Sequence, residues 1–390
     1  MPSDHLRGAG PNQGPIRLLA SARDPAAALH MVAVCRAIER DSRFTLHLVA
    51  QAPAAGMLRA AGLPVRELPS LRAQQPGDVA AVELLKLADG ILDELKPDIL
   101  LCGLSAPSEG GIDEALLARR QVPALLIQDF WGEQNHFFGA APDLTVVLDA
   151  YAAQLTWHRH GTPTLVAGSP RHSEYSGFDI GAARTRVRAM FAADTAAAKR
   201  VFIGLFGQPL HRFPGYQRTL DAWAQAVHGL PGTVHVIYRP HPRDTARDLS
   251  MTQRWLADRR IDFVTLQDET TEDAIAACDA ACTIFSNCAY DAAYMNYFSP
   301  TPLLTPVLML FDPELRSVLA ETGDYMRLPY IAGGLTLPVW REEDLAGALG
   351  RAAGEPCQAA VWAAARRELV NPLHAIEQIA ERIVLMAASR

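Results

Sequence analysis

Short apolar segments alternate with helical segments along most of the chain, and this alternation constrains the fold more than any other feature of the sequence. In the first half, Ile16–Ala20, Phe44–Ala50 and Ile99–Gly103 are apolar runs with the length of buried strands. Between two of them, Leu84–Leu95 has the periodicity of an amphipathic helix. Strands that alternate with helices in this way are typical of a parallel sheet with crossover helices. The sequence therefore predicts an α/β protein.

The same alternation restarts in the second half, which indicates two domains. At 390 residues the chain is long for a single hydrophobic core. Gly168-Ser169-Pro170-Arg171 interrupts the pattern before Lys199–Phe206 begins a new strand. We expect a disordered leader over residues 1–15, an N-terminal Rossmann-like domain over 16–167, a C-terminal one over 168–370, and a final helix over 371–390 that packs back on the first domain.

Composition argues against several classes of protein. The net charge is −7 and the lysines are Lys86, Lys96 and Lys199, so the chain has no basic patch for a nucleic acid. No apolar run reaches the ~20 residues of a transmembrane helix, and the leader lacks the apolar segment of a signal peptide. The six cysteines include no CxxC pair, which argues against a disulfide framework or a zinc ribbon. We expect a soluble, cytoplasmic protein.

The strand predicted over Val234–Tyr238 ends in a loop with basic side chains. Two prolines stop the strand and leave Arg239, His241 and Arg243 at its carboxyl end. Loops in this position bind ligands in open α/β sheets. The loop therefore predicts a site for an anion, although proline-flanked histidines are also common in surface turns.

A second candidate site follows the apolar strand that stops before Ser286. Ser286 and Asn287 are residue types that begin helices, and an alanine-rich helix is predicted behind them. Free backbone N–H groups and the helix dipole favour a phosphate at such a terminus. Asp291 lies about one and a half turns into the helix, where its carboxylate is placed to accept hydrogen bonds from a pair of sugar hydroxyls. The other interpretation is an ordinary strand-to-helix connection with no ligand. The basic loop and this terminus form one site only if their strands are neighbours.

Two loops of the first half carry acidic side chains. The first loop, Gly103–Gly111, contains Glu109. It has neither a GxGxxG nor a Walker sequence, so it predicts no dinucleotide or P-loop site. The alternative interpretation is a flexible turn in which Glu109 has no functional role. The next strand ends in Asp129, and Glu133 and His136 follow beside aromatic rings that can stack on a sugar. A carboxylate at the end of a strand is a candidate general base and equally a common helix cap.

These motifs resemble the GT-B superfamily of nucleotide-sugar enzymes, in particular its branch with a His-Pro motif. That branch includes capsule polysaccharide, sialyl and Kdo transferases, CDP-glycerol glycerophosphotransferases and UDP-N-acetylglucosamine 2-epimerases. The resemblance covers most of the chain from about Ile16 to Met295. The matching motifs are Ser21–Pro25, Gly168–Arg171, Pro240-His241-Pro242 and Phe285–Asp291.

The resemblance implies an α/β fold of two Rossmann-like domains facing a cleft. It also implies a nucleotide-sugar as co-substrate, with no other cofactor and no metal. His241 and Ser286 would contact the donor phosphates, and Asp291 would hold the ribose. The full set of donor-binding residues is Arg171, Gly207, Arg239, His241, Ser286, Asn287 and Asp291.

Cationic groups and a helix terminus stabilise the negative charge that develops on a departing phosphate, and the family supplies them through residues equivalent to Arg171 and Arg239. The family activates the acceptor with a carboxylate or histidine of the first domain. The corresponding catalytic candidates are Asp129 and, as substitutes, Glu109 and Glu133. Arg23 and His136 are the other residues expected in the cleft.

Two motifs depart from the family's pattern, and both bear on which branch of the family the chain resembles. Asn287-Cys288 replaces the Gly-Gly of the epimerases, and Ser108-Glu109-Gly110 only hints at the paired-acid motif of the sialyltransferases. We expect a metal-independent glycosyltransferase that moves a sugar from a nucleotide-activated donor to an unidentified acceptor, in cell-surface glycan or natural-product biosynthesis. The alternatives are a nucleotide-sugar 2-epimerase or hydrolase on the same fold, and a non-catalytic binding protein. The expected partners are the donor, the acceptor and, as an open alternative, a second copy of the chain in a homodimer.

Overall fold

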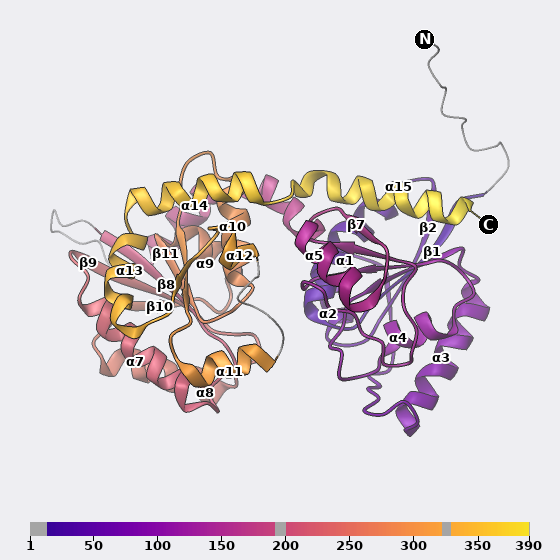
Figure 1. Ribbon diagram of the computed structural model, residues 1–390, viewed down its shortest axis with the longest axis horizontal. Coiled ribbons are helices and arrows are strands. Elements are labelled where there is room, and N and C mark those ends of the chain that lie inside the picture. The colour runs from indigo at the N-terminus through magenta and orange to yellow at the C-terminus, as the bar shows by residue number, and fades with distance from the viewer. Residues whose placement is uncertain (1–13, 192–199, 322–328, 390) are drawn as a thin grey trace, which may run out of the picture. The chain divides into compact units, whose positions relative to one another are not determined.

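The computed structural model describes residues 14–191, 200–321 and 329–389 (Figure 1). They belong to two compact units. Unit 1 contains residues 1–174 and 370–390, and unit 2 contains residues 175–369. The chain thus leaves unit 1 after Glu174 and returns to it after Leu369. The predicted leader lies outside the described residues, except for Gly14 and Pro15.

Unit 1 is built on a parallel sheet of seven strands in the order β3-β2-β1-β4-β5-β6-β7. The strands are β1 (Ile16–Ala22), β2 (Phe44–Ala50), β3 (Val65–Glu67), β4 (Ile99–Gly103), β5 (Ala124–Ile127), β6 (Leu144–Val147) and β7 (Thr164–Val166). The helices that accompany them are α1 (Pro25–Glu39), α2 (Ala54–Ala60), α3 (Val79–Leu95), α4 (Ile112–Arg119), α5 (Ala150–His160) and α15 (Ala375–Ala388).

The sheet of unit 1 is buried on both faces because successive side chains of a strand point to opposite sides. In β1, Leu18 and Ala20 join a core shared with α1, α2 and α15. Leu19 belongs to a second core shared with α3 and α4. Ile379 and Ile383 of α15 are fully buried in the first core, so the last helix of the chain completes unit 1, where it packs beside α1 (Figure 1).

Unit 2 is built on a parallel sheet of six strands in the order β10-β9-β8-β11-β12-β13. The strands are β8 (Arg200–Phe206), β9 (Thr233–Arg239), β10 (Phe263–Thr265), β11 (Ala280–Thr283), β12 (Thr305–Met309) and β13 (Leu337–Val339). The α-helices are α6 (Ile180–Arg188), α7 (Pro214–His228), α8 (Ala246–Asp258), α9 (Thr271–Ala277), α10 (Cys288–Phe298), α11 (Pro313–Glu321), α12 (Pro329–Ala332), α13 (Leu345–Ala352) and α14 (Glu355–Glu368). Within the described residues, the 3₁₀ helices are η1 (Pro170–Gly177), which spans the first crossing between units, η3 (Glu342–Asp344) and η4 (Pro372–His374), which belongs to unit 1.

The strands predicted from the sequence are present. The helix α4 was not predicted, although Asp113 and Glu114 in its first turn are residue types that favour the start of a helix. Among the described residues, no helix is long and apolar enough to cross a membrane.

Both sheets have the strand order of a doubly wound Rossmann-type fold, which confirms the predicted fold class. In such a sheet the chain winds outward in both directions from a central pair of strands. This switch point lies between β1 and β4 in unit 1 and between β8 and β11 in unit 2. Ligands of doubly wound sheets bind outside the carboxyl ends of the strands at this point. The two switch points therefore define where a functional site is expected in each unit.

Candidate functional site

The basic loop and the Ser286 junction lie at the same edge of unit 2, because β9 and β11 are parallel and both end there. Their strands are not adjacent, which corrects the expectation from the sequence: β8 lies between them and pairs with both. The loop after β8 therefore connects the two junctions. We call the loops after β8, β9 and β11 the unit 2 edge.

Gln208 connects the β8 loop to the β11 junction and was not predicted as a site residue. Its side chain is 6% exposed. Its Oε1 atom accepts hydrogen bonds from Phe285 N at 2.9 Å, Ile284 N at 3.1 Å and Thr283 Oγ1 at 3.2 Å. One amide oxygen thus fixes the backbone that leads into α10, at the switch point of the sheet. The only signal in the sequence was its place in the tight Gly207-Gln208-Pro209 loop.

Gly207 connects the β8 loop to the basic loop. Its N–H donates to Arg239 O at 2.9 Å, and a Cβ atom built on it would lie 3.4 Å from His241 N. The backbone of the His-Pro turn therefore lies directly beside that of Gly207.

His241 is held as a neutral imidazole. Its Nδ1 atom accepts a hydrogen bond from Arg243 N at 3.0 Å, so the proton of the neutral ring resides on Nε2. Burial and the nearby Arg243 charge lower the pKa of His241 below its ordinary value. At neutral pH, His241 therefore offers an N–H donor rather than a positive charge.

A second histidine at this edge, His211, was missed by the sequence analysis. His211 Nε2 lies 3.5 Å from Asp244 Oδ1, and that carboxylate raises the pKa of His211. The other oxygen of Asp244 accepts a hydrogen bond from His241 N at 3.0 Å. Asp244 thus joins the two histidines. His211 was missed because it lies outside any motif, four residues beyond Gly207.

Arg239 does not direct its guanidinium toward β8. It donates to the carbonyl oxygens of Leu266 and Gln267, which follow β10 on the opposite side of β9. At the other junction, Ser286 Oγ accepts from Cys288 N at 3.2 Å, while Asn287 occupies the N-cap position of α10 without a side-chain capping bond. The serine hydroxyl thus lies at the helix terminus.

Asp291 lies in the first turn of α10, but its side chain is only 3% exposed. Its carboxylate therefore has little surface open to a ligand in this structure.

Unit 1 places the predicted residues Arg23, Glu109 and Asp129 after the adjacent strands β1, β4 and β5, respectively. We call the loops after these strands the unit 1 edge. Arg23 is completely buried and donates to Glu109 Oε2, Glu109 O and Ala106 O, each at 3.3 Å. Arg72 donates to the same Glu109 oxygen at 3.2 Å. Glu109 is thus an ion-paired acceptor that anchors the β4 loop.

Asp129 is half-buried and lies just beyond β5, after Gln128. Burial raises its pKa to about 7, and the nearby carboxylates of Asp24 and Glu133 act in the same direction. The charge of Arg171 opposes this rise. Arg171 belongs to unit 1, where it acts on the predicted base, although the sequence suggested a role in donor binding. A carboxylate that exchanges its proton near neutral pH is well suited to general acid–base catalysis.

Glu133 and His136 have partners within the same loop region. Burial raises the pKa of Glu133, while Arg159, whose Nη1 lies 3.5 Å from Glu133 Oε1, opposes that rise. His136 Nε2 lies 3.1 Å from His160 Nδ1, and burial together with His160 lowers the pKa of His136. His160 Nε2 donates to the carbonyl of Gly132 at 2.9 Å, so the pair shapes the loop that carries Asp129.

Two buried acids at the switch point of unit 1 were missed entirely, because they lie on the unpredicted helix α4. Asp113 is 0% exposed and accepts from Ser21 Oγ at 2.5 Å; Glu114 is 3% exposed and accepts from Ser105 Oγ. Burial raises the pKa of both carboxyl groups. Arg23 Nη2 lies 3.8 Å from Glu114 Oε2. The unit 1 edge is therefore rich in groups that exchange protons, and the unit 2 edge is rich in hydrogen-bond donors.

The described residues contain no group of three or more His, Cys, Asp or Glu side chains that could hold a metal ion.

Comparisons with known proteins identify relatives by structure alone. No family model matches the sequence, and no curated protein matches it. MnaA of S. aureus in complex with UDP is similar over 94% of this chain and 96% of that one, with a TM-score of 0.67 and 12% identity. The UDP-GlcNAc 2-epimerase of Neisseria meningitidis bound to UDP-GlcNAc is similar over 95% and 100%, with a TM-score of 0.66 and 11% identity. A glycosyltransferase of Rickettsia africae is similar over 97% and 100%, with a TM-score of 0.62 and 10% identity.

These similarities extend along nearly the whole chain and confirm the predicted GT-B fold of two Rossmann-like domains. The neighbours include both epimerases and a glycosyltransferase. At identities this low, the likeness concerns the fold.

Proposed function

We propose that the chain is a glycosyltransferase that takes a sugar from a nucleotide-activated donor, with Asp129 as the general base. The observation that carries the proposal is the state of Asp129, a half-buried carboxylate at the end of β5 with a pKa of about 7. A general base is most effective when its pKa lies near the working pH. Glu109 is tied to two arginines and is a weaker candidate.

The unit 2 edge supplies groups suited to a phosphate ester. They are the Nε2–H of His241, the positive charge favoured on His211, and the N-terminal end of α10 beside Ser286. Donors and positive dipoles of this kind stabilise the charge that develops on a leaving phosphate. They support unit 2 as the donor-binding unit.

The reaction follows from these roles. Asp129 accepts the proton of an acceptor hydroxyl, and the acceptor oxygen forms a bond to the anomeric carbon of the sugar. The bond from that carbon to the phosphate oxygen breaks, and its electron pair remains on the nucleotide. The donors of the unit 2 edge stabilise the negative charge that results.

A nucleotide-sugar 2-epimerase or hydrolase is the second candidate. It is favoured by Glu133, a second, partly exposed acid near Asp129 whose pKa is also raised by burial, since transfer to an acceptor requires only one base. Solved structures of similar fold include an epimerase bound to UDP-GlcNAc. Such an enzyme would consume its nucleotide-sugar with no acceptor present.

A thermal-shift screen of UDP-, GDP-, CDP-, TDP- and CMP-sugars tests the donor class. A ligand at a hundred times its dissociation constant stabilises the protein by about 2.7 kcal/mol, which is readily measured. We expect one base to stand out and the His241→Ala variant to bind it roughly ten- to a hundredfold more weakly. If no nucleotide-sugar shifts the melting temperature, the proposal is wrong.

Incubation of the identified nucleotide-sugar without an acceptor separates the two candidates. A transferase leaves the donor largely intact until an acceptor hydroxyl is supplied, whereas an epimerase or hydrolase changes the sugar or releases nucleotide immediately. In either case the Asp129→Asn variant should bind the donor and lose turnover.

A further inference from the structure

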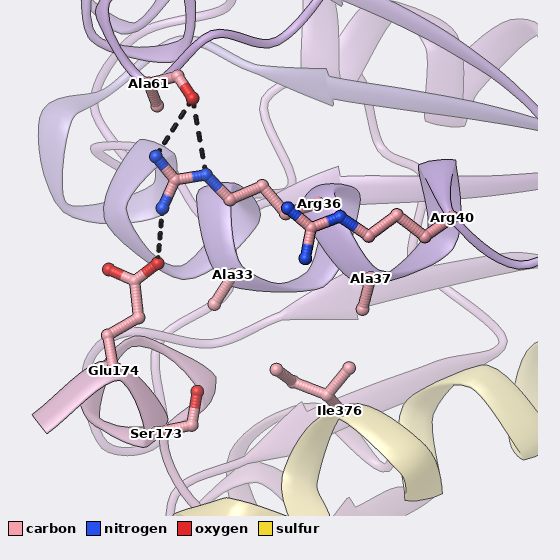
Figure 2. Close-up of a pocket in the computed structure, with 8 residues that line it drawn as sticks. All are labelled: Ala33, Arg36, Ala37, Arg40, Ala61, Ser173, Glu174 and Ile376. Atoms are coloured by element: carbon pink, nitrogen blue, oxygen red, sulfur yellow. Dashed lines mark hydrogen bonds and ion pairs between the residues drawn. The ribbon is translucent and has the colours of Figure 1, made fainter. Parts of the chain in front are cut away.

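Some of the contacts that hold unit 1 together do not depend on pH. Arg36 of α1 lines a hollow in which it donates to Glu174 Oε1 at 2.6 Å and twice to Ala61 O (Figure 2). A guanidinium stays protonated in proteins, so its bonds to the carbonyl oxygen persist in acid. The loop after β5, which carries Asp129, is held to α5 by histidines instead, and histidine titrates near neutral pH.

His160, the last residue of α5, contacts this loop at two points. Its Nε2 atom lies 2.9 Å from Gly132 O, and its Nδ1 atom lies 3.1 Å from His136 Nε2. A carbonyl oxygen only accepts hydrogen bonds, so Nε2 of His160 carries a proton. In the neutral ring, Nδ1 therefore has a lone pair, which accepts the Nε2 proton of His136. One side chain of α5 thus holds both ends of the segment from Gly132 to His136. We call His136 and His160 the histidine latch.

The segment held by the histidine latch is also bound to the unit 1 edge. Gln128, next to Asp129, donates to Glu133 O at 3.0 Å, and Asn135 donates to Glu109 O at 2.8 Å. These amide side chains do not titrate in the pH range in which histidine does. The segment therefore connects the residues around Asp129 to a pair of rings whose charge changes with pH.

The number of protons on the histidine latch decides whether its hydrogen bond exists. The neutral pair forms the bond described above. After one extra proton is bound, one ring is an imidazolium and donates to the lone pair of the other, so the bond remains and is charge-assisted. After a second proton is bound, neither ring has a lone pair, and two N–H groups would face each other across 3.1 Å. The second proton therefore breaks the contact between His136 and His160.

The surroundings of the histidine latch place this change in acid. Burial and the charge of His160 lower the pKa of His136 below its ordinary value. A released His136 binds the proton more tightly, so the closed loop is favoured above the ordinary histidine pKa of about 6.5 and loses stability as the pH falls. The charged and titratable groups that flank the histidine latch are Glu133 and the ion pair of Asp143 with Arg120 along the loop, and His158 and Arg159 on α5.

Two of these groups strengthen the effect of acid. Arg159 is a permanent cation next to His160, and its partner Glu133 lies 3.5 Å away. Burial raises the pKa of Glu133, so this carboxylate becomes neutral earlier than an exposed one as the pH falls. Acid thus adds positive charge to the histidine latch while it removes a negative charge beside it.

We propose that the histidine latch positions the general base: it holds the loop of Asp129 against α5 at neutral pH and releases that loop in acid. His136 and His160 are positioning residues, because they act through the loop. The role of Asp129 as the base rests on the proposed function above, whereas the release of the loop requires no activity.

Hydrogen exchange on the full chain tests the release of the loop without substrate. At each pH the exchange rate of a peptide is divided by the rate of the unfolded chain, so the ratio reports protection alone. We expect the protection of residues 130–140 to fall about tenfold between pH 7.5 and pH 5, whereas that of β1 does not fall.

Substitutions of His136 separate a latch from a packing contact. In His136→Gln the amide donates to neutral His160 and accepts from protonated His160, so we expect protection to persist at pH 5. His136→Ala loses both interactions, and its protection at pH 7.5 should be as low as that of the natural chain at pH 5. His158→Gln changes an exposed histidine of α5 and is the matched control, which should keep the pH dependence of the natural chain.

The exchange data contradict the proposal in three cases. Protection of residues 130–140 does not fall in acid, or it falls in His136→Gln as it does in the natural chain, or His158→Gln abolishes the fall. Each of these outcomes overturns the histidine latch.

Turnover measures the effect on the base. Asp129 titrates both in the natural chain and in His136→Gln, so the ratio of their kcat values removes that contribution. We expect the ratio of the natural chain to the variant to fall about tenfold from pH 7.5 to pH 5, with KM for the donor unchanged. A ratio that does not change with pH overturns the positioning role. An absence of turnover at both pH values contradicts the proposed function instead, while the exchange data still show whether the loop is released.

Discussion

The two units have the same doubly wound strand order, but different kinds of side chain bind the loops at their switch points. In unit 2, the neutral amide of Gln208 accepts three hydrogen bonds and fixes the turn into α10. In unit 1, the equivalent place is occupied by the buried Arg23 and by two acids, Asp113 and Glu114. The fold thus determines where the loops meet, whereas the side chains decide whether that place responds to pH. Buried ionisable groups at the switch point of unit 1 suit proton transfer, and the Nε2–H of His241 and the N-terminus of α10 at the unit 2 edge suit recognition of a phosphate.

The largest expected effect concerns the base of unit 1. Asp129→Asn keeps the shape of the side chain and removes its ability to take a proton. We expect the turnover rate to fall by about 10²- to 10⁴-fold while nucleotide affinity stays the same. Steady-state kinetics and calorimetry on one preparation measure both quantities. Glu133→Gln is the matched control. If it lowered the turnover rate as much as Asp129→Asn does, the assignment of Asp129 as the base would be wrong.

Next in size is the loss of the buried arginine of unit 1. Arg23→Met leaves Glu109 and Glu114 without their buried cation, so we expect the free energy of unfolding of unit 1 to fall by about 3–5 kcal/mol. Hydrogen exchange resolves unit 1 from unit 2 and locates the loss. Arg17→Met breaks an exposed pair with Asp98 and should change little. Equal losses in the two variants would contradict the structural role of Arg23.

The corresponding change in unit 2 should be smaller. Gln208→Ala leaves Ile284 N, Phe285 N and the Thr283 hydroxyl without their shared acceptor, which we expect to cost about 1–3 kcal/mol. Exposed Gln217→Ala on α7 is the control and should stay within about 0.5 kcal/mol. Urea unfolding followed by hydrogen exchange in unit 2 measures both. If Gln208→Ala lowered the free energy of unfolding as much as Arg23→Met does, the proposed difference between the two switch points would be wrong.

A further expected effect is the pH dependence that the buried Asp113 gives to the stability of unit 1. Burial raises the pKa of Asp113 in the folded state, so the folded chain binds its proton more tightly than the unfolded chain, whose aspartates titrate near pH ~4. The stability from this group is complete below that pH and is lost as the pH rises through the folded pKa. One proton gives a slope of at most about 1.4 kcal/mol per pH unit.

Asp113→Asn removes this slope, because the amide stays neutral and still accepts from Ser21 Oγ. We expect the variant to gain stability relative to the natural chain at pH 9 and to change little at pH 5. Urea unfolding at the two pH values tests this, with the exposed Asp89→Asn as control. A slope that is the same in Asp113→Asn as in the natural chain would assign the effect to other groups, such as Glu114 and Asp129.

The sequence predicted the strands and the shared edge because both follow from local patterns. The apolar runs of β1 and β4 are buried on two faces, and residues that follow parallel strands lie at one edge whatever the strand order. That reasoning placed His241 and Ser286 together. It did not place β8 between their strands, since the order of strands depends on packing between distant segments.

Residues missed by the sequence analysis have partners far along the chain. Asp113 depends on Ser21, which precedes it by 92 residues, and no local pattern distinguishes a buried acid from an exposed one. Arg239 was expected to face the phosphate, but the carbonyls after β10 bind its guanidinium. Arg171 was assigned to the donor from its motif, and the structure adds an effect that the motif did not indicate, since the charge of Arg171 opposes the rise in the pKa of Asp129. In each case the direction of a long side chain is set by tertiary contacts.

Unit 1 is assembled from two segments of chain that are separated by all of unit 2. During synthesis on a ribosome, every strand of unit 1 emerges early, but Ile379 and Ile383 of α15 emerge last. Until then α1 lacks the helix that packs beside it, and the core that α1 and α15 share is incomplete. Unit 2 is one continuous segment that contains all of its own strands, so it can complete its core before α15 is made. Unit 1 begins first along the chain but completes its core after unit 2.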